Sequence, residues 1–90
     1  MVTMEEDIQH AFPKSLRVIA SFSSDGRIRP LYAEYEDYTI KIDRVIQEKE
    51  VVDWGVGAIE YLCSYVQEDR RRDIRIRYAI EFHRWYLPTR

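Results

Sequence analysis

From residue 15 onward, hydrophobic side chains repeatedly alternate with polar ones, and this period of two predicts β-strands. The first such stretch is 15–23, in which Leu16, Val18 and Ala20 occupy alternate positions. The pair Asp25-Gly26 follows, and it predicts a hairpin turn because glycine adopts a positive φ without steric cost. The chain is therefore expected to begin its sheet with a hairpin.

That turn also predicts the register of the hairpin. Pairing outward from Asp25-Gly26 brings Ala20 opposite Leu31 on an apolar face. It brings Arg17 opposite Glu34 on the other face, where the two charges are complementary. The agreement on both faces supports the register.

A second tight turn, at Glu36-Asp37, extends the hairpin into a meander of three strands. It brings Tyr35 opposite Tyr38 and Ile40 into the apolar face. Beyond this strand the alternation fails at Arg44, which indicates a bulge or a bend.

The middle of the chain has no clean period. Residues 47–50 are polar or charged, and 51–57 contain two glycines around Trp54. We expect this stretch to form a connecting loop, partly held in place by Trp54.

Alternation returns in 59–66 and again in 74–82. A charged loop centred on Arg70-Arg71 would join these strands, and His83-Arg84 would turn the chain into a last strand ending at Pro88, which suits a strand end because it lacks an N–H donor. In this register Tyr78 and Ile80 lie at the centre of the core.

The first thirteen residues have a helical pattern instead. Thr3 and Glu6 have the spacing of a capping box, and Pro13 ends the segment. The apolar positions between them recur at helical spacing: Met4, Ile8, Ala11 and Phe12. We expect a short helix that depends on packing against the sheet.

These elements predict a mostly β, single domain over residues 1–90, with a helical segment at 1–13 and a β domain at 15–88. About six antiparallel strands in so short a chain favour a small barrel or a strongly curled sheet, because closure removes exposed edges. The helix would cover one opening or edge.

Composition narrows the class of protein. The 90 residues carry a formal net charge of −2, which argues against a dedicated duplex-DNA binder. A single cysteine excludes an internal disulfide. The acidic start is unlike a signal peptide, and no apolar run is long enough to span a bilayer, so a cytoplasmic location is expected.

Few residues suggest catalysis or metal binding. Cys63 lies in mid-strand on the inward face, as a buried, inert thiol does. His10 and His83 lack the spacing of a zinc site, and Gly55-Val56-Gly57 lacks the features of a phosphate-binding loop. We therefore expect no enzyme activity, no cofactor and no metal.

Arginines near the C-terminus are the most prominent candidate binding residues. Seven of the fourteen basic residues fall within the last twenty-one positions, and all are arginine. In the expected register Arg75 and Arg77 share an outward face, opposite Val66 and Ser64, without a carboxylate partner. The full candidate set adds exposed aromatics and comprises Arg70, Arg71, Arg72, Arg75, Arg77, Arg84, Tyr32 and Trp54.

Two interpretations of this set remain open. Arginine with aromatic side chains is typical of surfaces that bind single-stranded nucleic acid. The acidic residues nearby, such as Glu60, Glu68 and Asp73, also fit an ordinary solvated face with local charge near zero.

The segment Asp25-Gly26-Arg27-Ile28-Arg29-Pro30-Leu31 resembles a D-G-x-I-x-P-L hairpin. Together with the later I-x-R-V, R-Y and R-W pairs, it is similar to a group of small uncharacterised bacterial β proteins. In this chain those later motifs are Ile42–Val45, Arg77-Tyr78 and Arg84-Trp85. The resemblance implies a small β fold and carries no activity with it.

The leading functional expectation is a non-enzymatic binding or protein-interaction module. An open edge strand would provide the pairing surface, for a partner protein or for self-association. The alternative is a small barrel that binds single-stranded nucleic acid through its arginine-rich strand face. No membrane partner is expected.

Overall fold

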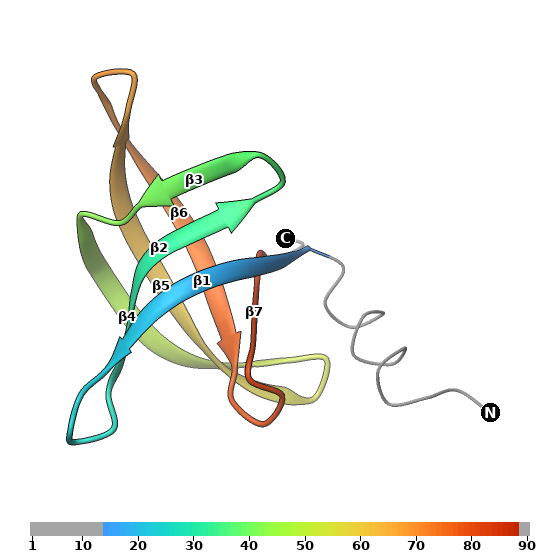
Figure 1. Cartoon of the computed structure of the whole chain (residues 1–90). Helices are drawn as coiled ribbons and strands as arrows, with labels where there is room; N and C mark the ends of the chain where they lie inside the picture. Colours follow the sequence, from blue (N-terminus) through green and yellow to red (C-terminus); the bar gives the residue numbers. More distant parts are fainter. Residues whose placement is uncertain (1–13, 89–90) are drawn as a thin grey trace.

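The computed structural model describes residues 14–88, which form an antiparallel sheet of seven strands (Figure 1). The strands are β1 (Ser15–Phe22), β2 (Ile28–Tyr35), β3 (Tyr38–Lys41), β4 (Arg44–Asp53), β5 (Val56–Gln67), β6 (Arg70–Ala79) and β7 (Arg84–Tyr86). The mostly β, antiparallel class is confirmed. The helix expected over residues 1–13 lies outside the described residues. No helix within residues 14–88 has the length and apolarity that crossing a membrane would require.

The strand order is β3-β2-β1-β7-β6-β5-β4, so β3 and β4 are the two edges. They do not pair with each other, and the expected barrel is wrong. The reason lies in the short link between them. The Ile42 N–H donates to the carbonyl of Leu31 in β2, whereas the Asp43 N–H donates to Ser64 in β5, both at 2.9 Å. The two edges therefore meet only at this corner and diverge from it.

The core lies between the meander β1–β3 and the longer strands β4–β6, which curl around it (Figure 1). Tyr61 of β5 is fully buried, and its hydroxyl donates to the carbonyl of Ile28 in β2 at 2.8 Å. Trp85 packs against Tyr61 and Tyr78, with ring centroids 5.6 and 4.9 Å away. The hydrogen bond from Tyr61 to Ile28 crosses the interior and joins the two halves of the curled sheet, while Trp85 packs beside Tyr78, its cross-strand neighbour.

The first hairpin confirms half of its predicted register: the pairs from Arg17 to Ile19 match, whereas those from Ala20 to Phe22, beside the turn, are shifted by one residue. Arg17 lies opposite Glu34, and Gly26 holds a φ of 86° in the turn. The pairing of Ala20 with Leu31 is wrong, because a bulge brings Pro30 opposite Ala20. Of this pair of neighbours, Pro30 is therefore the buried residue and Leu31 is exposed. The pairing of Tyr35 with Tyr38 in the second hairpin is confirmed.

The expected loop over 47–57 is wrong. Residues 44–53 form β4, with a bulge between Val45 and Gln47, and a two-residue turn at Trp54-Gly55 returns the chain into β5. The sequence of β4 does not alternate between apolar and polar residues because β4 is an edge strand, whose side chains are mostly exposed on both faces.

The registers around β6 also differ from the expected ones. The β5–β6 turn is Glu68-Asp69, so Arg77 lies opposite Glu60 and not Ser64. The turn into β7 spans residues 80–83, which leaves Ile80 exposed and only Tyr78 in the core. Both shifts preserve the faces of β6 but change every cross-strand partner.

Candidate functional site

The outer face of β6 carries a charged network centred on Glu60. Arg77 donates from Nε to Glu60 Oε1 at 2.9 Å and from Nη1 to Asp53 Oδ2 at 2.9 Å. Arg75 Nη1 and Lys49 Nζ reach Glu60 Oε2 at 3.3 and 3.5 Å. The expectation that Arg75 and Arg77 have no carboxylate partner is therefore wrong, because the true register places Glu60 opposite Arg77 and within reach of Arg75.

Glu60 is only 4% exposed, so its ionisation depends on these partners. Burial alone would raise the pKa of the Glu60 carboxyl. The hydrogen bond and charge of Arg77, with the charges of Lys49 and Arg75, outweigh burial and lower the pKa from its ordinary value of 4.5. Glu60 is thus held as a carboxylate and is unsuited to act as a general acid.

Asp53 extends this network to β7. The Tyr86 hydroxyl donates to Asp53 Oδ2 at 3.1 Å. Burial of the hydroxyl is the main cause that raises the pKa of Tyr86 to about 12, and the negative charge of Asp53 is the second. Among the described residues, no buried side-chain nitrogen or oxygen lacks a hydrogen-bond partner. This network stabilises the packing of β4, β5, β6 and β7.

The remaining candidate arginines are divided between paired and open positions. Arg71 donates to Ser64 at 2.7 Å and lies 3.9 Å from Asp43, and Arg84 donates to Ser15 at 3.1 Å. Arg70 and Arg72 have no ion-pair partner within residues 14–88. They lie at the end of the β5–β6 hairpin, which extends beyond the body of the sheet (Figure 1).

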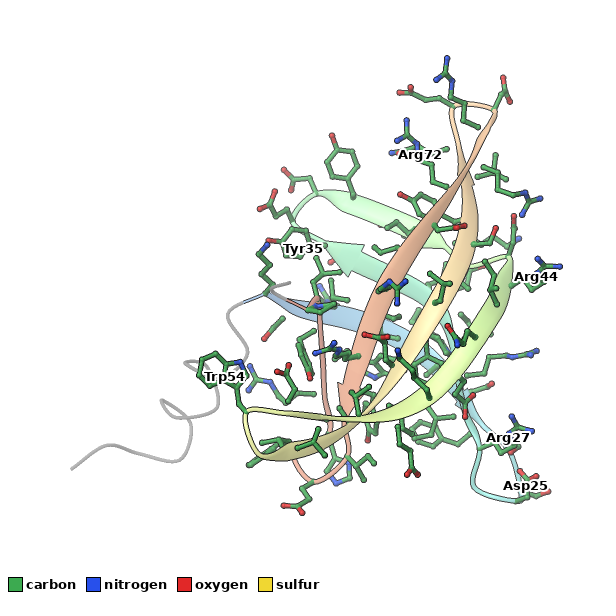
Figure 2. All side chains as sticks on the ribbon, turned by 180° about the vertical axis from the view of Figure 1, so that it is seen from behind. Asp25, Arg27, Tyr35, Arg44, Trp54 and Arg72 are labelled. Atoms are coloured by element: carbon green, nitrogen blue, oxygen red, sulfur yellow. The ribbon has the colours of Figure 1, made fainter. Side chains whose placement is uncertain are left out.

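The structure does not bring the two candidate aromatics to these arginines. Tyr32 lies on β2, opposite Ile19 and Lys41. Figure 2 shows Trp54 and Arg72 at opposite ends of the molecule. The predicted set therefore does not gather on a single surface.

Strand β4 is a candidate that sequence reasoning missed. It has ten residues and pairs with β5 on one side, while no strand of the described chain pairs with its other side. In a two-residue hairpin the residues next to the turn bond to each other, and the bonded positions then alternate. Glu48, Glu50 and Val52 consequently direct their backbone N–H and C=O groups away from β5.

Two grooves border β4. One, of about 530 Å³, lies between residues 45–48 and the β1–β2 hairpin, where Arg27 is 3.9 Å from Glu48. The other, of about 400 Å³, is lined by Glu50, Val51, Val52, Gly57, Ala58 and Ile80. Both the first half of β4 and its end therefore border space that side chains of a partner could enter.

The end of β4 exposes large apolar side chains. Val52 is 78% exposed, Trp54 is 74% exposed, and Ile80 beside them is 44% exposed. Trp54 also holds a φ of 54°, a left-handed conformation that is unusual for a bulky residue. Exposed tryptophan is common at the energetic centres of protein interfaces, and backbone strain is often retained at functional positions.

The other chemically interesting residues are structural. Cys63 is buried in the core, as expected, and burial raises the pKa of its thiol to about 11. His83 Nδ1 lies 2.8 Å from the Tyr78 hydroxyl. No group of three or more potential metal ligands occurs within the described part of the chain.

Comparison of the chain with protein families, with curated proteins and with solved structures finds no match. Function is therefore inferred from the geometry of β4 and of its surroundings.

Proposed function

We propose that this protein is a protein-interaction module that binds an extended segment of a partner by adding it to the sheet beside β4. The single observation that carries the proposal is the open side of this edge, ten residues long, which ends in exposed Val52 and Trp54. Strand addition uses main-chain hydrogen bonds for affinity and pockets for alternate side chains for specificity. β4 offers both.

The other edge is a weaker candidate for the same role. β3 has only four residues, and short edge strands are a common protection against unwanted pairing. Ile46 and the adjoining bulge interrupt the start of β4, so the usable surface is its regular part, residues 47–53.

Nucleic-acid binding is the second candidate, supported by one observation. Arg70 and Arg72 are exposed on a projecting hairpin without an ion-pair partner in the described chain. The acidic turn Glu68-Asp69 lies directly beside them, and Arg75 and Arg77 are already engaged by Glu60. These two features make a phosphate backbone the less favoured ligand.

A proline substitution tests the proposed function. Glu50→Pro removes an N–H that points away from β5, so it blocks strand addition and preserves the β4–β5 ladder. Thr39→Pro is the matched control, because the same alternation directs the Thr39 N–H away from β2 at the other edge.

The assay is selection of binders from a displayed library of random extended peptides, with thermal melting of each variant to verify folding. Peptides selected on the wild-type protein should lose binding to Glu50→Pro and keep binding to Thr39→Pro. Equal binding to both variants would contradict the proposal.

A further inference from the structure

We infer that the partner strand at β4 is a basic segment of another protein, with lysine or arginine at two alternate positions. This inference rests on the proposed function and deepens it by assigning the chemistry of the ligand. The observation behind it is a pair of glutamates on one face of an open edge.

Glu48 and Glu50 lie on the same face of β4. They are opposite Tyr61 and Ile59, both of which face the core, so the two carboxylates lie on the inner face beside the apolar interior. A side chain added at the edge would meet them at cross-strand distance, where opposite charges attract and like charges repel.

Within the described chain this face is partly neutralised at Glu48, where Arg27 and Arg29 line the same groove, and stays acidic at Glu50. Arg27 approaches Glu48 at 3.9 Å, but its side chain is largely exposed, and such a pair contributes little. Glu50 forms no ion pair within residues 14–88. Lys49 points to the opposite face, where it approaches Glu60 at 3.5 Å.

A second copy of the same strand matches this face poorly. Pairing two β4 strands in antiparallel orientation about Glu48, Lys49 or Glu50 places glutamate opposite glutamate. Pairing about Val51 avoids that clash, but it uses only residues 49–53 and leaves Glu48 outside the paired region. Inward charges of this kind are a known protection of edge strands against self-association.

The complement of the edge can be written as a pattern. Read from its N-terminus, an antiparallel partner meets Val52 first, then Glu50, then Glu48. It should therefore carry an apolar residue, a basic residue two positions later and a second basic residue two positions after that. The exposed Val52 and the groove beside it would receive the apolar side chain.

Two synthetic peptides test the inference. One contains the core Val-Thr-Lys-Thr-Lys, and the other has both lysines replaced by glutamate. Binding is measured by chemical-shift titration of the full chain, which also reports whether the peptide lies at β4. We expect the lysine peptide to bind about tenfold or more tightly than the glutamate peptide.

Variants of the protein complete the test. Glu48→Gln with Glu50→Gln should remove the preference between the two peptides, whereas Glu36→Gln with Asp37→Asn, in the β2–β3 turn, should preserve it. Equal affinity of both peptides at β4 would overturn the charge assignment and leave strand addition intact. If neither peptide shifts the β4 resonances, the proposed function itself fails. A concentration-dependent dimer abolished by Glu50→Pro would instead identify a second copy as the partner.

Discussion

The two faces of β4 carry charge in opposite situations. On the outer face, Lys49 and Asp53 belong to a network in which Glu60 and Arg77 are mostly buried and form ion pairs with their neighbours. On the inner face, Glu48 and Glu50 lie at the open edge, and only the long contact from Arg27 approaches them within the described chain.

The difference distinguishes charged side chains that stabilise the fold from charged side chains that are available to bind a partner. A charged side chain that register brings opposite its counter-ion, and that neighbours bury, holds the fold together. A charged side chain of the same type at an unpaired edge is not neutralised, so it can attract an oppositely charged partner that binds at that edge. The number of arginines in a strand does not reveal which of them are available for binding. Arg77 and Arg72 belong to the same strand, but Arg77 is paired with Glu60 and Asp53, whereas Arg72 has no ion-pair partner within residues 14–88.

The largest expected effect is on the outer network. Arg77→Ala leaves Glu60 and Asp53 without their main cation, and removing one partner of a buried pair costs about 3–5 kcal/mol. Arg75→Ala is the matched control, because that side chain is half exposed and should change the free energy of unfolding by no more than about 1 kcal/mol. Chemical denaturation of both variants checks the difference. Similar losses for the two arginines would show that burial does not distinguish them.

The apolar side of the same strands provides the next comparison. Ile76→Ala removes a fully buried side chain, and we expect a loss of about 2–5 kcal/mol. Ile80→Ala changes an exposed side chain in the turn after β6 and should lower the free energy of unfolding much less. Thermal melting measures both. A larger loss for Ile80 would mean that the β6–β7 turn is misplaced.

Acid should weaken the outer network. The pKa of Glu60 is lower in the folded chain than its ordinary value of 4.5, so its stabilisation is fully present above that pH. It is lost as the pH falls through the lower, folded pKa. Unfolding free energies measured from pH 7 down to pH 3 should therefore fall less steeply for Glu60→Gln than for wild type. The same slope in both proteins would contradict this role.

The smallest effect is expected on the inner face. Glu48→Gln with Glu50→Gln changes exposed side chains that do not hold the fold together, so the free energy of unfolding should change by about 0.5 kcal/mol or less. Chemical denaturation beside the Arg77→Ala variant measures it. A loss of several kcal/mol would show that these glutamates are structural.

The sequence predicted the strands best where turn chemistry was explicit. Asp25-Gly26 contains the glycine that a positive φ favours, and the predicted register was correct from Arg17 to Ile19, on the far side of the bulge from the turn. Glu68-Asp69 forms a two-residue turn with no glycine, both residues having positive φ. Nothing local marked that turn, and the resulting shift hid the pairing of Arg77 with Glu60.

The candidate site was less predictable for a related reason. β4 has charge on both faces because it is an edge strand, so its sequence lacks the alternation of a half-buried strand. Its identity as an edge depends on strand order, which is a long-range property of the chain. Trp54 was recognised as a candidate binding residue, but its place at the end of β4 follows only from the structure.

Backbone hydrogen exchange along β4 tests the central claim most directly. In the free protein, the amides of Lys49 and Val51 should be protected by β5, while those of Glu48, Glu50 and Val52 exchange rapidly. Addition of the lysine peptide should slow exchange at Glu48, Glu50 and Val52, and leave β3 unchanged. Protection of all five β4 amides in the free, monomeric protein, or no new protection with a bound peptide, would contradict the account.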